Sequence, residues 1–80
     1  IISEVIIYPN PASEYVQVTI PELIANVSVI IHDALGRKVM QQEITNTNSV
    51  RMDLNGISRG IYYVSISEGK NSVTKKLIIK

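Results

Sequence analysis

The titratable side chains of this chain are scattered singly, which argues against a catalytic site. His32 is the only histidine, and it lies one residue before a predicted turn, on the polar face of a predicted strand. No serine or cysteine in a recognisable nucleophile context accompanies it, so we interpret it as a surface residue rather than a general base. The 7 carboxylates also stand apart, whereas a glycosidase needs two that face each other across a cleft. The sequence therefore predicts that the chain is not an enzyme.

No pattern in the sequence is typical of a cofactor or metal site. Zinc sites combine cysteines and histidines, but the chain has no cysteine and a single histidine. No Asp-x-Asp-x-Asp loop suggests calcium, and the 4 glycines do not form a phosphate-binding loop. We therefore expect neither a cofactor nor a metal ion.

Length and composition indicate one small, strand-rich domain spanning residues 1–80. A chain of this size buries about 60–65% of its unfolded surface, and without cysteine no disulfide adds stability. Ile and Val supply 23 of the 80 residues, and their branched side chains favour strands over helices. The net charge of +1 is too small to propose binding to nucleic acid or to a membrane surface. No apolar run reaches the roughly 20 residues of a membrane-spanning helix.

The elements that must position any functional residue are short strands separated by turns. Residues 15–20 alternate strictly, with Val16, Val18 and Ile20 on one face, and this period of two is typical of a half-buried strand. Prolines, glycines and polar bends interrupt the apolar segments about every ten residues. The predicted strands cover residues 5–8, 15–20, 27–32, 38–44, 49–54, 60–66 and 72–80. This pattern predicts an all-β fold, a seven-stranded antiparallel immunoglobulin-like β-sandwich, with a small β-barrel as the alternative.

Positive charge concentrates after Gly69, where 4 lysines occur without any acidic residue. Lysines on an edge strand protect it from pairing with other chains, and that is one interpretation of Lys75, Lys76 and Lys80. The other is that they form a basic segment recognised by a partner. An exposed edge strand would also allow two copies to pair, so a homodimer is kept as an alternative.

Three motifs occur in order along the chain, and together they carry a family resemblance. They are Tyr8-Pro9-Asn10-Pro11-Ala12, Asp33-Ala34-Leu35-Gly36-Arg37-Lys38-Val39, and Gly60-Ile61-Tyr62-Tyr63-Val64-Ser65-Ile66 followed by Lys75-Lys76-Leu77-Ile78-Ile79-Lys80. In this order and spacing, the chain resembles the C-terminal sorting domain of the type IX (Por) secretion system of Bacteroidetes. The resemblance covers nearly the whole chain.

The resemblance implies a non-catalytic secretion signal fused to the C-terminal side of a cargo protein. Such cargo crosses the inner membrane by an ordinary signal peptide, passes through the periplasm, and reaches the outer-membrane translocon. A sortase-like peptidase then commonly removes the domain and anchors the cargo at the cell surface or leaves it outside the cell. Because cleavage falls on the N-terminal side, we expect the chain to derive from a longer secreted precursor, with the scissile bond upstream of Ile1.

The resemblance also assigns roles to individual residues. Lys75, Lys76, Leu77, Ile78, Ile79 and Lys80 match the terminal segment that carries sorting information. Pro9, Asn10, Pro11, Asp33, Gly36, Arg37, Gly60 and Tyr62 match motifs that we interpret as mainly structural. Within these, we expect Asp33 and Arg37 to pair across a turn, and Tyr62 to be buried with its hydroxyl hydrogen-bonded.

Recognition of the last strand is the mechanism that these features favour. We expect a receptor to read the exposed edge of that strand, its lysines and the terminal carboxylate, with edge pairing as one physical route. Two other classes stay open: a carbohydrate-binding or adhesion module using Tyr8, Tyr15 or Tyr63, and a passive fibronectin-like spacer.

Overall fold

The computed structural model describes residues 4–80, without the side chains of residues 21–25, and consists of antiparallel strands joined in one sheet. The strands are β1 (Ile6–Tyr8), β2 (Tyr15–Asp33), β3 (Lys38–Asp53), β4 (Gly60–Glu68) and β5 (Asn71–Ile79). The long strand β2 lies at the centre, because it pairs with β1, β3 and β4, whereas β5 pairs with β4. Within residues 4–80, no helix has the length and apolar character needed to cross a membrane.

The predicted all-β antiparallel fold is confirmed, but the predicted number of seven strands is wrong. β2 runs without a break through two predicted strands, and β3 does the same. Pro21 directly follows the predicted strand 15–20, yet the backbone stays extended through it. The register between β2 and β3 shifts between Thr19 and Ile24, and such an irregular stretch tolerates the missing proline N–H. Asn46, on the facing strand, has a positive φ of 55°, so both strands bend together instead of ending.

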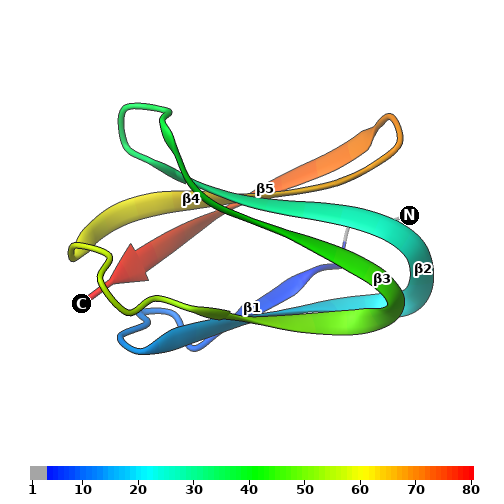
Figure 1. The fold of residues 1–80 in the computed structure, drawn as a ribbon, viewed down its shortest axis with the longest axis horizontal. Helices are drawn as coiled ribbons and strands as arrows, with labels where there is room; N and C mark the ends of the chain where they lie inside the picture. Colours follow the sequence, from blue (N-terminus) through cyan, green and yellow to red (C-terminus); the bar gives the residue numbers. More distant parts are fainter. Residues whose placement is uncertain (1–3) are drawn as a thin grey trace.

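This bend folds the single sheet over into two layers (Figure 1). One layer contains β1, the first half of β2 and the second half of β3, and the other contains the remaining halves with β4 and β5. A parallel bridge between Ala12 and Ile79 connects the layers on the side opposite the bend. The sheet is therefore nearly closed, and the barrel alternative describes it better than a sandwich of two separate sheets.

The core lies between the two layers and follows the predicted alternation. Val16, Val18 and Ile20 have no exposed surface, as their period of two indicated. The second half of β2 and the strands β3, β4 and β5 contribute buried side chains in the same alternating way, among them Val27, Val29, Ile31, Met52, Val64, Ile66, Leu77 and Ile79. Burial of these aliphatic groups is the main force that holds a cysteine-free domain together.

The three sequence motifs gather at one end of the molecule (Figure 1, left). Residues 9–14, the β2–β3 turn at 33–37, the segment 54–60 and the last residues of β5 all lie there. We call this the motif end. The β4–β5 turn and the bend of β2 and β3 lie at the opposite end.

Candidate recognition site at the end of β5

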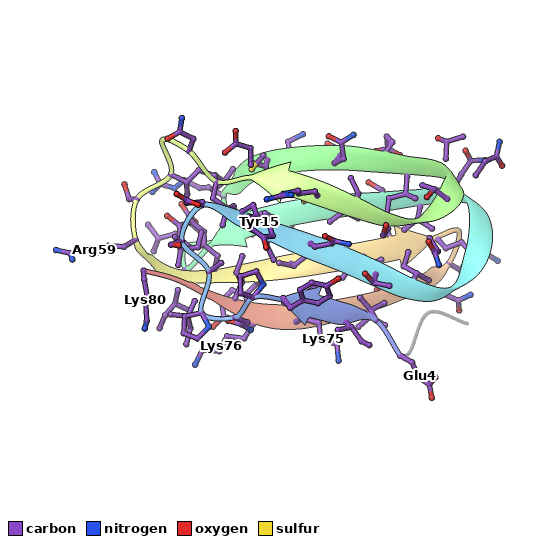
Figure 2. The ribbon with its side chains drawn as sticks, turned by 90° about the horizontal axis from the view of Figure 1, so that it is seen from below. Glu4, Tyr15, Arg59, Lys75, Lys76 and Lys80 are labelled. Carbon is purple, nitrogen blue, oxygen red and sulfur yellow. The ribbon has the colours of Figure 1, made fainter. Side chains whose placement is uncertain are left out.

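The last residues of β5 present alternate side chains to the core and to the outside. Leu77 and Ile79 are buried, with exposed fractions of 0% and 3%, so they belong to the core. Lys76, Ile78 and Lys80 point outward and are exposed. Lys75 is half-buried, and Figure 2 shows its side chain extending away from the barrel. The segment predicted for recognition is thus divided between groups that hold the fold and groups that a partner can contact.

The outer edge of β5 is closed over residues 76–80 by the segment that carries the Pro-Asn-Pro motif. The side chain of Asn10 donates through Nδ2 to the carbonyl of Lys76 at 2.9 Å and accepts at Oδ1 from the N–H of Ile78 at 3.0 Å. Ala12 then donates to the carbonyl of Ile78 at 2.7 Å and accepts from the N–H of Lys80 at 2.7 Å. The expectation of an exposed strand edge is therefore wrong for residues 76–80. No described strand pairs with the outer edge at 71–75.

The composition of this segment explains why it pairs through a side chain. Pro9 and Pro11 have no N–H, so two of three successive backbone donors are missing. The carboxamide of Asn10 carries one donor and one acceptor, the same pair as a peptide group. Ala12 is completely buried, and its backbone continues the contact. This motif was predicted to have a mainly structural role, and pairing with β5 is a specific role that the sequence interpretation missed.

The β2–β3 turn is held by the carboxylate of Asp33. Its Oδ1 accepts from the N–H groups of Leu35 and Arg37, both at 2.9 Å. Its Oδ2 accepts from Nε of Arg37 at 2.9 Å, which confirms the predicted pair. Hydrogen bonding from the Arg37 N–H, aided by the Arg37 side chain and the Leu35 N–H, keeps the pKa of Asp33 below its usual value. Gly36 has a φ of 86°, a left-handed conformation that a glycine adopts without steric cost.

Tyr62 fastens the segment that leads into β4. Its ring is buried, with 7% of the surface exposed, and its hydroxyl donates to the carbonyl of Ser58 at 2.5 Å. Both features were predicted. Because β4 pairs with β5 from Gly60 opposite Ile79, this contact also supports the strand that carries the candidate site.

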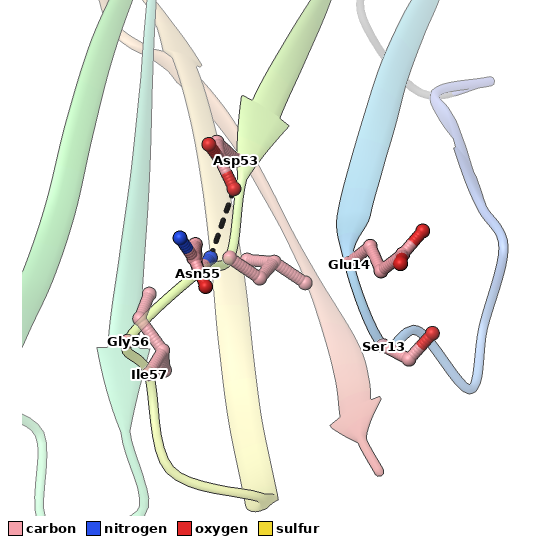
Figure 3. A pocket seen from close by; sticks show the side chains of 7 residues that line it. Ser13, Glu14, Asp53, Asn55, Gly56 and Ile57 are labelled. Atoms are coloured by element: carbon pink, nitrogen blue, oxygen red, sulfur yellow. Dashed lines mark hydrogen bonds between the residues drawn. The ribbon is translucent and has the colours of Figure 1, made fainter.

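A shallow recess beside the motif end contains acidic groups but no arrangement suited to catalysis (Figure 3). It measures about 430 Å³, and Ser13, Glu14 and Asp53 are among its lining residues. Asp53 accepts from the N–H of Asn55 at 2.9 Å, and the Glu14 carboxylate points away from Asp53 (Figure 3). His32 does not line this recess. In the part of the chain that the structure describes, no three metal-ligating side chains gather.

The exposed tyrosines do not form a shared platform for a sugar. Tyr8 lies on the outer face of β1, in register with Gln17 of β2, whereas Tyr63 lies on β4 in the other layer. Tyr15 is half-buried, and the guanidinium of Arg51 lies over its ring, 3.6 Å from the centroid. Tyr15 shares an outer face with Tyr8, but Arg51 covers its ring, and the two exposed tyrosines, Tyr8 and Tyr63, lie in different layers. This arrangement disfavours stacked recognition of a carbohydrate, which would require free aromatic rings that face the same ligand.

Comparison with known proteins identifies the same family as the three sequence motifs. Residues 6–80 match the family described as "Secretion system C-terminal sorting domain". The chain is 30% identical over 92% of its length to part of a β-agarase A from Zobellia galactanivorans. It is 31% identical over 98% of its length to part of an endo-acting ulvan lyase from Formosa agariphila. It spans only 13% and 15% of these two relatives.

The match covers nearly all of the chain, including all three motifs. Domains of this family are non-catalytic sorting signals attached to larger proteins, which they direct to the cell surface or the extracellular space. The chain therefore belongs to the family of secretion system C-terminal sorting domains, the sorting signals of type IX secretion.

Proposed function

We propose that the outer-membrane translocon of the type IX system recognises this domain in its folded form, through outward side chains at the end of β5. The residues concerned are Lys76, Ile78 and Lys80, with Lys75 at their margin. The observation that supports this proposal is the closed edge of β5. Four backbone groups that point away from β4, the carbonyls of Lys76 and Ile78 and the N–H groups of Ile78 and Lys80, are bonded to Asn10 and Ala12, so a partner meets mainly side chains at this end of the strand.

In this mode of recognition, the inward residues of β5 stabilise the fold and the outward residues contact the receptor. Leu77 and Ile79 anchor β5 in the core, and their burial sets the direction of the residues between them. Lys76 and Ile78 then project from a strand that is fixed on both sides, by β4 and by residues 10–12. A prearranged surface loses little conformational entropy on binding, which favours specific contacts with a receptor.

The route of the parent protein is part of the same proposal. The cargo is fused to the N-terminal side of the domain, enters the periplasm through a signal peptide, and then meets the translocon. A sortase-like peptidase cleaves on the N-terminal side of the domain and either anchors the cargo at the surface or releases it. Neither step requires a catalytic group from the domain itself.

Export of a reporter tests the function directly. The 80 residues are fused behind an exported fluorescent protein in a Bacteroidetes host, and fluorescence is measured at the cell surface, in the medium and in the periplasm. We expect the unmodified fusion to leave the cell and a fusion with Lys76→Glu, Ile78→Thr and Lys80→Glu to accumulate in the periplasm. Lys70→Glu is the matched control, because Lys70 is exposed in the β4–β5 turn at the opposite end.

Two outcomes would contradict the proposal. Retention of the unmodified fusion would show that the domain is not a sufficient signal in that host. Normal export of the triple variant, with an unchanged unfolding temperature, would show that the outward side chains of β5 are not read. A passive spacer predicts a third pattern, in which the domain works equally well when moved to an internal position of the fusion.

A further inference from the structure

Exposed apolar side chains concentrate on one face of the domain. Among the described residues, seven large apolar side chains are exposed, and two of them, Ile6 and Tyr8, lie on or at the end of β1. The other five, which we call the apolar stripe, are Leu35, Val39, Ile61, Tyr63 and Ile78. They come from the β2–β3 turn, the start of β3, and β4 and β5, so the second and third motifs contribute to one surface.

Register and a shared recess show that the stripe is continuous. Leu35, Val39 and Ile61 line one shallow recess of about 410 Å³ between the β2–β3 turn and the start of β4. Ile61 lies directly opposite Ile78 in the β4–β5 ladder, and opposite residues of a ladder share a face. Tyr63 lies opposite Lys76 in the same ladder, which extends the stripe along β4.

Leu35 is presented in a way that suits an anchor residue. Its side chain is 80% exposed, although its turn is fixed by three hydrogen bonds to the carboxylate of Asp33 and one from the Gly36 N–H to the Asp33 carbonyl. A flexible loop would lose entropy when an apolar tip enters a pocket, whereas this turn is already ordered. Residues that fill a well-packed, desolvated pocket near the centre of an interface carry much of its binding energy.

The charges around the stripe are mostly positive. Arg37 and Arg59 line the recess, and Lys76 lies beside Tyr63. Figure 2 shows Arg59, Lys76 and Lys80 at the same end of the molecule. Asp33 is the one carboxylate among the residues that line the recess, and its oxygens are bonded to Arg37 and to backbone N–H groups. A partner that complements this surface must therefore be acidic.

We propose that the apolar stripe is a second docking surface, which binds a protein that offers an apolar pocket for Leu35 surrounded by carboxylates. The inference rests on the proposed function in one respect, namely that this partner belongs to the secretion machinery. Apart from Ile78 it uses residues outside β5, so it extends the recognised surface from the last strand to the Asp33–Arg37 turn and the start of β4. A hollow of about 410 Å³ beside Leu35 fits side chains of a folded partner better than the flat surface of a lipid layer.

Export of two stripe variants tests the docking surface. In the fluorescent fusion, Leu35→Ser combined with Ile61→Thr removes the apolar anchor, and Arg59→Glu reverses a charge at the recess. We expect each to lower fluorescence outside the cell at least tenfold. Ile6→Thr is the control for the first variant, because Ile6 is 58% exposed on β1, and Lys70→Glu is the control for the second. Both controls should stay within twofold of the unmodified fusion, and all purified fusions should unfold at the same temperature.

Site-specific cross-linking identifies the partner. A photoreactive amino acid at position 35, compared with one at position 6, should cross-link the exported fusion to one envelope protein at an acidic segment. Replacing an acidic residue of that segment by lysine should then restore export of the Arg59→Glu fusion. Normal export of both stripe variants would overturn the docking surface while leaving the proposed function intact.

Further outcomes of these experiments would contradict the docking surface or change its partner. Equal cross-linking at positions 35 and 6, or a cross-link to a segment without carboxylates, would contradict the docking surface. Binding to vesicles of phosphatidylglycerol and phosphatidylcholine that disappears in the Leu35→Ser, Ile61→Thr variant would replace the protein partner by a membrane. Retention of the unmodified fusion inside the cell would count against the proposed function. The docking surface would then be tested only by whether position 35 cross-links to an acidic segment of an envelope protein.

Discussion

The side-chain carbonyl of Asn10 accepts a hydrogen bond from the backbone N–H of Ile78 at 3.0 Å, across 68 positions of the sequence. The amide nitrogen of the same side chain donates to the carbonyl of Lys76 at 2.9 Å. One carboxamide therefore satisfies two successive backbone groups at the edge of β5, as a neighbouring strand would. Through this contact the first motif of the chain fixes the last one.

Removal of the Asn10 carboxamide should loosen the end of β5 without unfolding the domain. Two hydrogen bonds are lost in Asn10→Ala, and at about 0.5–1.5 kcal/mol each the free energy of unfolding should fall by about 1–3 kcal/mol. Amide exchange at Ile78 should accelerate more than at Leu77, whose N–H points towards β4. Hydrogen exchange followed by NMR, together with urea unfolding, measures both effects.

A second substitution at this position separates the donor from the acceptor. Asn10→Asp keeps an oxygen for the Ile78 N–H but turns the other oxygen towards the Lys76 carbonyl, so we expect a loss of stability at least as large at neutral pH. Asn48→Ala, at an exposed position of β3, is the control and should change stability by less than about 0.5 kcal/mol. Unchanged exchange at Ile78 in both Asn10 variants would show that the contact does not hold the strand.

The ring and the hydroxyl of Tyr62 should contribute unequally to stability. Tyr62→Phe removes the hydrogen bond to the Ser58 carbonyl and should cost about 0.5–1.5 kcal/mol. Tyr62→Ala also empties a buried site and should cost about 3–5 kcal/mol, a large part of the stability of so small a domain. The adjacent Tyr63→Ala, at a side chain 39% exposed, should cost much less. Thermal and urea unfolding of the three variants should show the largest loss of stability for Tyr62→Ala, and a similar cost for Tyr62→Ala and Tyr63→Ala would contradict the assigned core.

Substitutions at adjacent residues of β5 should affect stability and export differently. Leu77→Ala removes a fully buried side chain and should lower the free energy of unfolding by about 2–5 kcal/mol. Ile78→Ala changes an outward side chain that is 39% exposed, so its effect on unfolding should be clearly smaller. Under the proposed function, Ile78→Ala reduces export of a domain that is still folded, whereas Leu77→Ala reduces the amount of folded domain. Comparison of soluble, folded fusion with exported fusion distinguishes the two cases.

Acid should weaken the turn that presents Leu35. The pKa of Asp33 is lowered in the folded domain, chiefly by hydrogen bonding from the Arg37 N–H. A carboxyl with a lowered folded pKa contributes stability that is fully present above its unfolded pKa. This contribution is lost as the pH falls below about 4 and through the folded value. Asp33→Asn should therefore be less stable than the unmodified domain at pH 7, with the difference shrinking by pH 3.

The measurement is urea unfolding at several pH values. Glu4→Gln is the control, because Glu4 is exposed and has no hydrogen bond to a described residue. A constant difference between Asp33→Asn and the unmodified domain from pH 7 to pH 3 would show that the ionised Asp33 does not stabilise the turn.

Local pattern was sufficient to predict which faces are buried. Val16, Val18 and Ile20, and likewise the inward residues of β4 and β5, reach the core because a strand turns successive side chains to opposite sides. The Asp33–Arg37 pair and the burial of Tyr62 were predictable for the same reason, since each depends on neighbours within a few positions or on strand parity. Strand number was not predictable, because whether Pro21 ends a strand depends on the register of β3 beside it.

The sequence by itself therefore determined the class of fold, the faces of the strands and the family. The tertiary structure decided that residues 10–12 close the edge of β5, and that Leu35, Ile61 and Ile78 share one surface. Both relationships join segments that are distant along the chain. The first exists because β2 and β3 bend and bring the two layers together, and the second because β4 pairs with β2 and β5 pairs with β4 within one layer. The hydrogen-bonding groups of a residue are fixed by its type, but the groups that they pair with depend on how the sheet closes.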